Sequence, residues 1–513
     1  MILSILYILV ILSLMLIMMI LFKGVFLITM NNVINSVWEL SLNFNCNYMN
    51  LFSITVIILS MFITFYCMNY MQSDIFISRF CWILISFIIS MVILNLSNSN
   101  WILWLGWEGL GVTSFLLIIY YTNWKSNNSS MTTLMVNRIG DFSLMLVMIP
   151  FSYYLIWDLN NFKFSAYFCI MLMFAIFAKS AQIPFQSWLP IAMAAPTPVS
   201  SLVHSSTLVV AGTVICMKLN NFFFNYTMLI MTMIGFMTSL YASFMAIVEK
   251  DFKKILAYST MSQIALVMFM VSSNLMKLMI FHIVNHAFAK ALLFMNVGLY
   301  ILYLFGNQES RQLELKTFNN SIISFMLIMS LMIMCGLFFT SCYYSKEYHL
   351  IFIFNQESLN YMTNFMIFMS FMYSVRMITY ILMNINSKIT QNFFIKENLM
   401  NILLFMFALC SGWFLNFNFS IPFNMDWSTK KMMIMYLPIL IIFFSSHTLK
   451  SLMNLDMMYT FPIKFLMKIN YVFNSKIKMM SMSVNTLMSQ YLFVSDMKMI
   501  ILPIFMLMMM IMV

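Results

Sequence analysis

The chain has 513 residues, of which 63% are hydrophobic and only 8% are charged. A soluble domain needs roughly a quarter of its residues charged to cover its surface, so this composition excludes a soluble fold. The net charge of +11 is typical of a membrane chain whose basic residues are biased to one side and contact lipid headgroups. No compact basic domain supports nucleic-acid binding.

Apolar runs long enough to cross a bilayer recur along the chain. Met1–Phe22 and Phe80–Trp107 contain no charged side chain, and a helix needs ~20 apolar residues to span ~30 Å of hydrocarbon. Barrel strands would alternate over ~10 residues, a pattern that the sequence lacks. We therefore predict an all-α polytopic membrane protein with about 15 transmembrane helices. The predicted spans are 2–22, 51–70, 80–98, 101–121, 131–156, 165–183, 196–217, 226–248, 254–273, 276–304, 321–341, 361–383, 399–416, 432–449 and 497–513.

Two segments near the ends of the chain have distinct patterns. The first apolar segment has no basic region before it and no small-residue cleavage site, so we expect a retained span rather than a signal peptide. Residues 455–496 contain recurrent Lys among Met, Phe, Ile and Tyr. This pattern predicts an amphipathic helix that lies along the membrane rather than through it.

The sequence carries no signature of a bound cofactor. The eight cysteines show no C-x-x-C spacing, and the five histidines form no H-E-x-x-H set. Neither a P-loop nor a G-x-G-x-x-G motif occurs. We therefore expect no metal site and no iron–sulfur cluster in this chain, and any redox chemistry is expected in partner proteins.

The 60 methionines exceed what packing requires, although Met packs adaptably. An AT-rich gene read with a code in which ATA means Met would produce this bias. The composition therefore indicates a mitochondrial genome, as an inference about coding rather than about chemistry.

Two apolar segments are interrupted. Pro184 and Pro190 break one helix, Pro196 and Pro198 begin the next, and FFTSCYYSKE (338–347) places polar groups in a second apolar segment. Unwound backbone at membrane depth is tolerated only where protein or water satisfies it. Two interrupted segments in corresponding halves indicate a transport site built on internal repeats.

Glu108 and Lys179 each lie in an apolar segment. A charge at the bilayer centre costs at least ~2.5–3.5 kcal/mol on insertion scales, so it needs a reason. Burial favours a neutral lysine and a nearby carboxylate favours a charged one, so the two together form a switchable proton carrier. The structural alternatives are a hydroxyl such as that of Thr113 satisfying Glu108, and snorkelling of Lys179 to an interface.

His282, His286 and Lys290 follow one another at a spacing of four residues. On a helix this spacing places them on one stripe ~12 Å long. Three protonatable groups in a row suggest a proton relay. A metal site is weakly supported because no carboxylate or thiolate completes it, and an interhelical hydrogen-bonding face is the structural alternative.

Lys346 and Glu347 follow the second interruption, and His204 lies in a Ser/Thr-rich helix start. The first two could form a proton site or a loop-facing ion pair. His204 could equally be part of a relay or a satisfied structural imidazole.

A charged loop, EKDFKK (249–254), precedes the span 254–273. Lys253 is a candidate in it, whereas Lys250 and Lys254 are expected to be solvated. Arg138 and Asp141 are three residues apart on one predicted helix and could simply pair with each other.

Six motifs occur in order along the chain: GWEGLG (106–111), NRIGD (137–141), AKSAQIPFQSWLPIAMAAPTPVSSLVHSSTLVVAG (178–212), LAYSTMSQ (256–263), HAFAKALLF (286–294) and YYSKE (343–347). Together they closely resemble the subunit 5 family of mitochondrial NADH:ubiquinone oxidoreductase, respiratory complex I, an antiporter-like membrane-arm subunit. They follow that family's order, and the third block is highly specific.

The resemblance implies two inverted five-helix repeats, each with a discontinuous helix, and a lateral helix near the C-terminus. The chain then divides into N-terminal transmembrane helices, an antiporter-like proton-translocating core, C-terminal transmembrane helices, the lateral amphipathic helix and a final transmembrane helix. Their expected boundaries are 1–98, 99–390, 391–454, 455–496 and 497–513.

The same resemblance implies site residues. Glu108 matches the family's helix-five carboxylate, and Lys179 matches the lysine of the first broken helix. His204 and Lys253 match polar positions of a central hydrophilic axis. The central relay and the second broken helix, at the exit side, correspond to His282, His286, Lys290, Lys346 and Glu347. Glu347 departs from the Asp usual in the family but keeps the carboxylate.

By resemblance, the chain is expected to be a core membrane-arm subunit of complex I in the mitochondrial inner membrane. It would couple NADH-to-ubiquinone electron transfer in partner subunits to proton translocation through a Glu/Lys/His relay, without a redox centre of its own. FMN, iron–sulfur clusters and ubiquinone are expected in partner subunits. The expected partners are other membrane-arm subunits, accessory subunits and membrane lipids such as cardiolipin.

Two alternatives stay open. The first is a subunit of a multisubunit sodium/proton antiporter, which shares the fold; GWEGLG, NRIGD and the mitochondrial-type composition argue against it. The second is a structural anchor whose lysines merely hold helices together. In that case replacing Lys290 would impair assembly as much as turnover.

Overall fold

The computed structural model describes residues 25–31, 37–43, 47–72, 74–97, 99–153, 166–220, 223–271, 276–303, 306, 308–309, 321–337, 340–352, 357–383 and 401–412. The chain divides into two compact units, Met1–Met425 and Asp426–Val513, and all described residues belong to the first. The predicted spans 2–22, 432–449 and 497–513, and the predicted lateral helix 455–496, lie outside the described residues.

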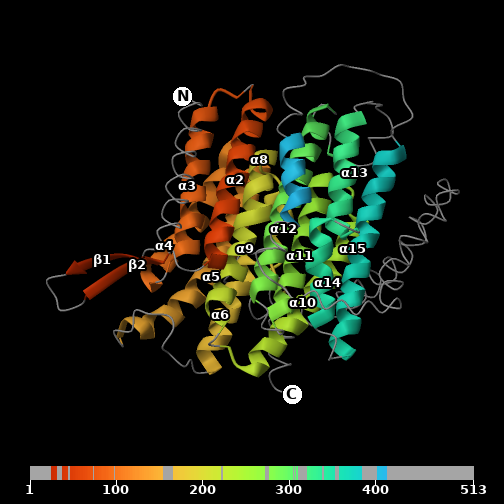
Figure 1. Ribbon diagram of the computed structural model, residues 1–513. Helices are drawn as coiled ribbons and strands as arrows, with labels where there is room; N and C mark the ends of the chain where they lie inside the picture. The colour runs from red at the N-terminus through yellow and green to blue at the C-terminus, as the bar shows by residue number, and fades with distance from the viewer. Residues whose placement is uncertain are drawn as a thin grey trace, which may run out of the picture. The chain divides into compact units, whose positions relative to one another are not determined.

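Helices form nearly all of the described structure and run side by side from α2 and α3 to α13 and α15 (Figure 1). Every predicted span between residues 51 and 416 overlaps a described helix or run of helices. The helices are α2 Asn47–Tyr70, α3 Ile77–Leu96, α4 Asn100–Ile118, α5 Trp124–Tyr153, α6 Ala166–Lys179, α7 Trp188–Ala192, α8 Thr197–Leu202, α9 Leu208–Lys218, α10 Asn225–Val248, α11 Phe252–Met270, α12 Met276–Tyr303, α13 Ser321–Cys335, α14 Ser341–Phe352 and α15 Glu357–Met383. A 3-10 turn, η1 Ile119–Tyr121, follows α4, a π-helical segment, η2 Val203–Thr207, joins α8 to α9, and a further short apolar helix spans Asn401–Gly412.

Several of these helices can cross a membrane. In the described part of the chain, six segments are long and apolar enough, because each presents at least 18 residues of high mean hydropathy with few charges. They are Met49–Tyr70, Ile77–Leu96, Asn100–Tyr121, Thr197–Lys218, Tyr226–Val248 and Met276–Leu302. The larger predicted number of about 15 spans stays a prediction.

A β-hairpin is the one described element that the all-α prediction did not include. Strands β1 Val25–Asn31 and β2 Val37–Asn43 pair antiparallel, with Val25 opposite Asn43 and Asn31 opposite Val37. The first strand, VFLITMN, is rich in β-branched and aromatic residues, and the second, VWELSLN, begins with Val37 and Trp38; such residues favour extended backbone. The segment was expected to connect two spans.

The first interrupted helix ends at Lys179 rather than at Pro184. α6 stops five residues before that proline, and the chain then turns through Ala181, whose φ is +53°, and a cis Ile183–Pro184 bond. The carbonyl groups freed by the break are satisfied locally. Trp188 donates its indole N–H to the Ala178 carbonyl at 2.9 Å, as buried backbone at membrane depth requires.

The second interruption also begins before the predicted end of its span, 321–341. α13 ends at Cys335, and Gly336 follows with a φ of +82°, a conformation that glycine adopts without steric cost. The Lys346 amine, one turn into α14, donates to the carbonyls of Met334 at 2.7 Å and Cys335 at 3.2 Å. A cation at the carboxyl end of a helix is favourable because it meets the unpaired carbonyls there.

Small residues let three helices approach closely around the first break. A Cβ atom on Gly140 of α5 would lie 2.7 Å from the Ala178 Cβ of α6, and one on Gly212 of α9 would lie 2.7 Å from the Ile176 carbonyl oxygen. Glycine at such positions permits backbone-to-backbone packing between membrane helices. The close packing fixes where α6 ends relative to α5 and α9.

Replacing Gly212 with Ala is therefore expected to destabilise the bundle by about 1–3 kcal/mol, because backbone atoms must move to admit the methyl group. Thermal inactivation of the purified protein measures the effect. Val112→Ile, which also adds one carbon atom but on the exposed side of α4, is the control and should leave the midpoint unchanged. Equal midpoints for Gly212→Ala and the control would show that α6 and α9 are not closely packed.

Candidate functional site

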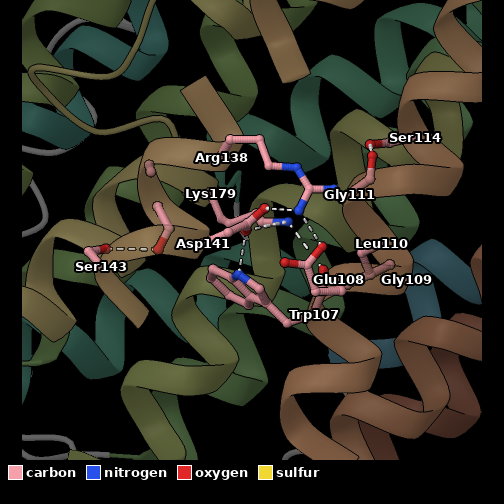
Figure 2. A network of polar contacts seen from close by, with 12 residues as sticks. Trp107, Glu108, Gly109, Leu110, Gly111, Ser114, Arg138, Asp141, Ser143 and Lys179 are labelled. Carbon is pink, nitrogen blue, oxygen red and sulfur yellow. Dashed lines mark hydrogen bonds and ion pairs between the residues drawn. The ribbon is translucent and has the colours of Figure 1, made fainter. Parts of the chain in front are cut away.

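A cluster of charged side chains joins α4, α5 and the end of α6 (Figure 2). Arg138 contacts two carboxylates, Glu108 at 2.6 Å and Asp141 at 3.5 Å. The Lys179 amine lies 3.7 Å from Asp141. The four charges therefore form a continuous line, in the order Glu108, Arg138, Asp141 and Lys179.

The Lys179 side chain is completely buried. Its amine lies 3.3 Å from the Trp107 carbonyl oxygen and 4.7 Å from the centroid of the Trp107 ring, so a cation there is stabilised by an aromatic face as well as by Asp141. The Trp107 indole donates to Asp141 at 2.7 Å and holds the carboxylate in place. Snorkelling to an interface is wrong for Lys179, because its amine is directed into the bundle.

The predicted direct pairing of Lys179 with Glu108 is wrong in its detail. Asp141 contacts the lysine, and Arg138 lies between the two carboxylates. The predicted pairing of Arg138 with Asp141 is confirmed, but Asp141 is also the site residue that sequence reasoning missed, because its local partner seemed sufficient. Thr113 does not satisfy Glu108, since its hydroxyl donates to the Gly109 carbonyl at 2.6 Å.

The charge line runs from the side of the bundle to its interior. The side chains of Arg138 and Glu108 are 44% and 19% exposed, whereas those of Asp141 and Lys179 are 5% and 0% exposed. The outer end of the line is therefore accessible at the side of the bundle, and Arg138 connects it to the buried Asp141–Lys179 pair.

His204 lies in the π-helical segment η2, next to the first break. It is completely buried, and neither ring nitrogen has a hydrogen-bond partner among the described residues. Its ring lies 6.2 Å from that of Trp188, the residue whose indole reaches the last turn of α6. Single π-helical turns occur frequently at functional sites. This one places in the bundle an imidazole whose ring nitrogens have no hydrogen-bond partner among the described residues.

Lys253 is buried at the start of α11 and donates to the Ala195 carbonyl at 3.2 Å. That carbonyl belongs to the turn between α7 and α8, so Lys253 links α11 to the region after the first break. The adjacent Lys254 instead pairs with Asp251 at 2.8 Å and is 38% exposed. The expectation that Lys254 and Lys250 are solvated is confirmed, because Lys250 is also exposed.

The predicted stripe lies on α12 and is buried along its whole length. Lys290 donates to the Ser259 hydroxyl and, at 3.3 Å, to the Leu256 carbonyl of α11. The rings of His282 and His286 are stacked with centroids 6.5 Å apart. A hydrogen-bonding face explains Lys290, but neither nitrogen of His286 has a partner among the described residues.

His282 reaches α14. Its Nδ1 lies 2.8 Å from the Ser345 hydroxyl, which itself donates to the Cys342 carbonyl at 3.0 Å. A hydroxyl has only one proton to donate, so whenever Ser345 donates to the Cys342 carbonyl, Nδ1 of His282 is the donor in this contact.

Lys346 is buried and faces the end of α13, with the Ser370 hydroxyl of α15 at 3.3 Å. Glu347 is half-buried, and among the described residues it forms no ion pair with Lys346. The loop-facing ion pair is therefore wrong. The lysine is held by carbonyl and hydroxyl oxygens rather than by a counter-charge.

Two further polar residues near the stripe were missed. Asn285 donates to the Ser341 carbonyl at 2.9 Å and accepts from Ser411 at 3.0 Å, so it fixes the second break beside the histidines. His349 on α14 is completely buried, and its ring nitrogens have no partner in the described part of the chain. The motif YYSKE stopped two residues before His349, and a lone histidine at this position gives no sign of its burial.

The described residues contain no group of three or more His, Cys, Asp or Glu side chains that could hold a metal ion. The expectation that cofactors belong to partner subunits stays a prediction. What the arrangement offers chemically is a set of buried titratable side chains.

Comparison with known proteins identifies relatives along most of the chain. The family described as "NADH:quinone oxidoreductase/Mrp antiporter, TM" matches residues 97–375. NADH-ubiquinone oxidoreductase chain 5 of Caenorhabditis elegans is 34% identical over 467 residues, which cover 88% of this chain and 87% of the relative.

Two solved structures share the fold at low sequence identity. A chain of an archaeal membrane-bound sulfane sulfur reductase, a respiratory membrane complex, has a TM-score of 0.70 at 17% identity, covering 80% of this chain and 89% of that chain. A chain of the Mrp complex from a Dietzia species has a TM-score of 0.64 at 18% identity, covering 93% of this chain and 59% of that chain.

Proposed function

The chain belongs to the NADH:quinone oxidoreductase/Mrp antiporter family, among the chain 5 subunits of NADH-ubiquinone oxidoreductase, and we propose that it translocates protons in the membrane arm of that enzyme. Electron transfer from NADH to ubiquinone takes place in partner subunits and drives the translocation. In this proposal the enzyme belongs to the mitochondrial inner membrane, and its redox centres lie in the partner subunits.

One observation carries the proposal: buried titratable groups extend through the described bundle with few counter-charges. Lys179 has a carboxylate partner, whereas Lys253, Lys290 and Lys346 are held by carbonyl and hydroxyl oxygens. Ionisable groups inside a membrane protein are costly and mark ion pathways. A purely structural role would favour paired or apolar side chains at these positions.

The charge line provides the switch. Arg138 is shared by Glu108 and Asp141, so its movement towards Asp141 weakens the hold of that carboxylate on Lys179, and the lysine releases its proton. Movement towards Glu108 restores the pair. Moving one proton against 100 mV costs ~2.3 kcal/mol, and a shift of two pKa units corresponds to ~2.7 kcal/mol, so an electrostatic switch of this size is on the right scale.

The released proton would follow the buried groups across the bundle. His204 and Lys253 lie after the first break, and His286 and Lys290 lie on α12. His282 then leads to α14, where Lys346 and Glu347 stand. Gaps between these side chains are crossed through water, which bridges polar groups at little cost in free energy.

The proposed partners follow from this role. Other membrane-arm subunits would contact the exposed end of the charge line, and accessory subunits and membrane lipids, cardiolipin among them, would cover the apolar sides. Exposed large side chains such as Leu105, Val112 and Phe142 can pack against either a subunit or a lipid, because apolar surface is stable against lipid or another membrane helix.

A subunit of a multisubunit sodium/proton antiporter is the alternative function. It is less favoured, because the chain 5 relative is 34% identical over 88% of this chain, whereas the Mrp chain is only 18% identical. The likeness to the Mrp chain concerns the fold alone.

Purification through a tag on this chain separates the two functions. We expect flavin and iron–sulfur subunits to co-purify, and the reconstituted complex to pump protons when given NADH and a quinone. Sodium/proton exchange without any NADH-dependent activity would support the antiporter instead. A mock purification from untagged membranes controls for carry-over of abundant respiratory enzymes.

The geometry also predicts that Asp141 contributes more to coupled quinone reduction than Glu108 does. Asp141→Asn removes the ion-pair partner of a buried lysine, a change that costs roughly 3–5 kcal/mol in buried pairs, whereas Glu108→Gln leaves the Asp141–Lys179 contact in place. Coupled quinone reduction, normalised to flavin content, is expected to fall more in Asp141→Asn than in Glu108→Gln. The opposite ranking would restore Glu108 as the direct partner.

A further inference from the structure

His349 is a buried imidazole that the proposed path does not use. Its side chain is fully shielded, and both ring nitrogens are without partners among the described residues. An imidazole kept only for packing would be replaced at no cost by an apolar side chain, because buried polar groups are unfavourable unless they are hydrogen-bonded. Its presence needs another explanation.

The position of His349 on α14 continues the histidine stripe. It lies four residues after Ser345, whose hydroxyl contacts His282, and three residues after Lys346. Residues three and four apart lie on the same side of a helix, ~6 Å apart along the axis. His349 is therefore one helical turn beyond the contact through which α12 reaches α14.

That turn leads towards an end of the bundle. α14 ends at Phe352, three residues after His349. The His349 ring packs edge-on against Phe269, with centroids 5.9 Å apart, and Phe269 is the penultimate residue of α11. His282 lies six residues after the start of α12. Along the axis of the bundle, His349 therefore lies between His282 and the end of the bundle where α11 and α14 terminate.

Resting on the proposed function, we propose that His349 carries protons between the His282 end of the stripe and this end of the bundle. The imidazole takes up a proton on one ring nitrogen and releases one from the other, with water as the carrier on either side, so no charge is left behind after each transfer. Imidazole suits this task because one of its ring nitrogens donates while the other accepts, so a proton can enter at one and leave from the other. His349 thereby extends the relay to its last described side chain.

Two variants test the proposal in the assembled enzyme. His349→Phe keeps an aromatic ring against Phe269 but cannot carry a proton, and His349→Gln keeps polarity without titrating. Both are expected to assemble, with normal flavin content, and to lower coupled quinone reduction and proton pumping about tenfold, less than the 10²–10⁴ of a full acid–base catalyst because the site is close to the end of the bundle. Tyr348→Phe, on the same helix, is the matched control and should retain native rates.

Native rates of turnover and pumping in either assembled His349 variant would overturn the proposal. Failure of both variants to assemble would also overturn it, because it would assign His349 a packing role. Lys179→Met, measured in parallel, separates this inference from the proposed function. If Lys179→Met stops pumping and His349→Phe does not, only the role of His349 fails; if neither affects pumping, the proposed function fails.

Discussion

Replacing Lys179 with Met is expected to lower coupled quinone reduction and proton pumping by about two orders of magnitude, the lower end of what a positioned proton carrier contributes. Met fills most of the space of a lysine side chain, so the close packing of α5, α6 and α9 is retained. The amine that contacts Asp141 and Trp107 is lost, and with it the group on which the charge line acts. NADH-driven acidification of vesicles containing the purified enzyme measures the result.

Lys218→Met is the matched control for this experiment. Lys218 is part-buried at the end of α9 and donates to the carbonyls of Leu94 and Ser97, both at 2.7 Å. It caps the carboxyl end of α3 and lies outside the proposed path, so its loss should lower stability but not the number of protons pumped per electron. Unchanged turnover and pumping in Lys179→Met would remove Lys179 from the mechanism.

Replacing Lys290 with Met is expected to give an enzyme that assembles normally but turns over at least about tenfold more slowly. Lys290 contacts the Ser259 hydroxyl and the Leu256 carbonyl, oxygens that gain little stability from a lysine once desolvation is counted. A relay role therefore predicts a loss of rate, whereas an anchor role predicts a loss of assembly. Native gel electrophoresis and turnover, measured on the same membranes, distinguish them.

Lys254→Met provides the control for Lys290. Lys254 lies on the neighbouring helix α11, its side chain is 38% exposed, and it pairs with Asp251 at the start of the same helix. Exposed ion pairs contribute only ~0–1 kcal/mol, so this variant should assemble and turn over as the native enzyme does. A proportional loss of assembly and turnover in Lys290→Met would instead favour the structural anchor.

Much of the helical organisation could be predicted from the sequence. Charge-free apolar runs identified the spans, and Pro184 indicated the break next to Lys179. The predicted boundary was nevertheless four residues too long, since α6 ends at Lys179 itself. Proline marks where a helix cannot continue, but not where packing against neighbouring helices ends it.

The partner of Lys179 could not be predicted in the same way. Spacing within one helix explains why Arg138 and Asp141 are neighbours. It does not predict which residues of different helices are in contact. The contact of Asp141 with Lys179 depends on the close approach of α5 and α6 that Gly140 permits. Only the three-dimensional packing shows that Asp141, rather than Glu108, faces the lysine.

Local backbone irregularities were also beyond sequence reasoning. The π-helical segment that carries His204 has the Ser/Thr-rich sequence VHSST, which predicts a helix start but does not distinguish a π-turn from an α-turn. His349 was overlooked for a related reason, because a lone histidine near a helix end gives no sign of its burial. Its position became informative only once Ser345 was seen to contact His282.

In the proposed function, protons cross this chain along the buried groups between Lys179 and Lys346. An experimental density map of the assembled enzyme, at a resolution that shows water, tests it most directly. We expect ordered water molecules bonded to the ring nitrogens of His204 and His286 and joining the lysines. Dry, apolar packing around both imidazoles, with no polar contact leading from Lys179 towards Lys346, would contradict it.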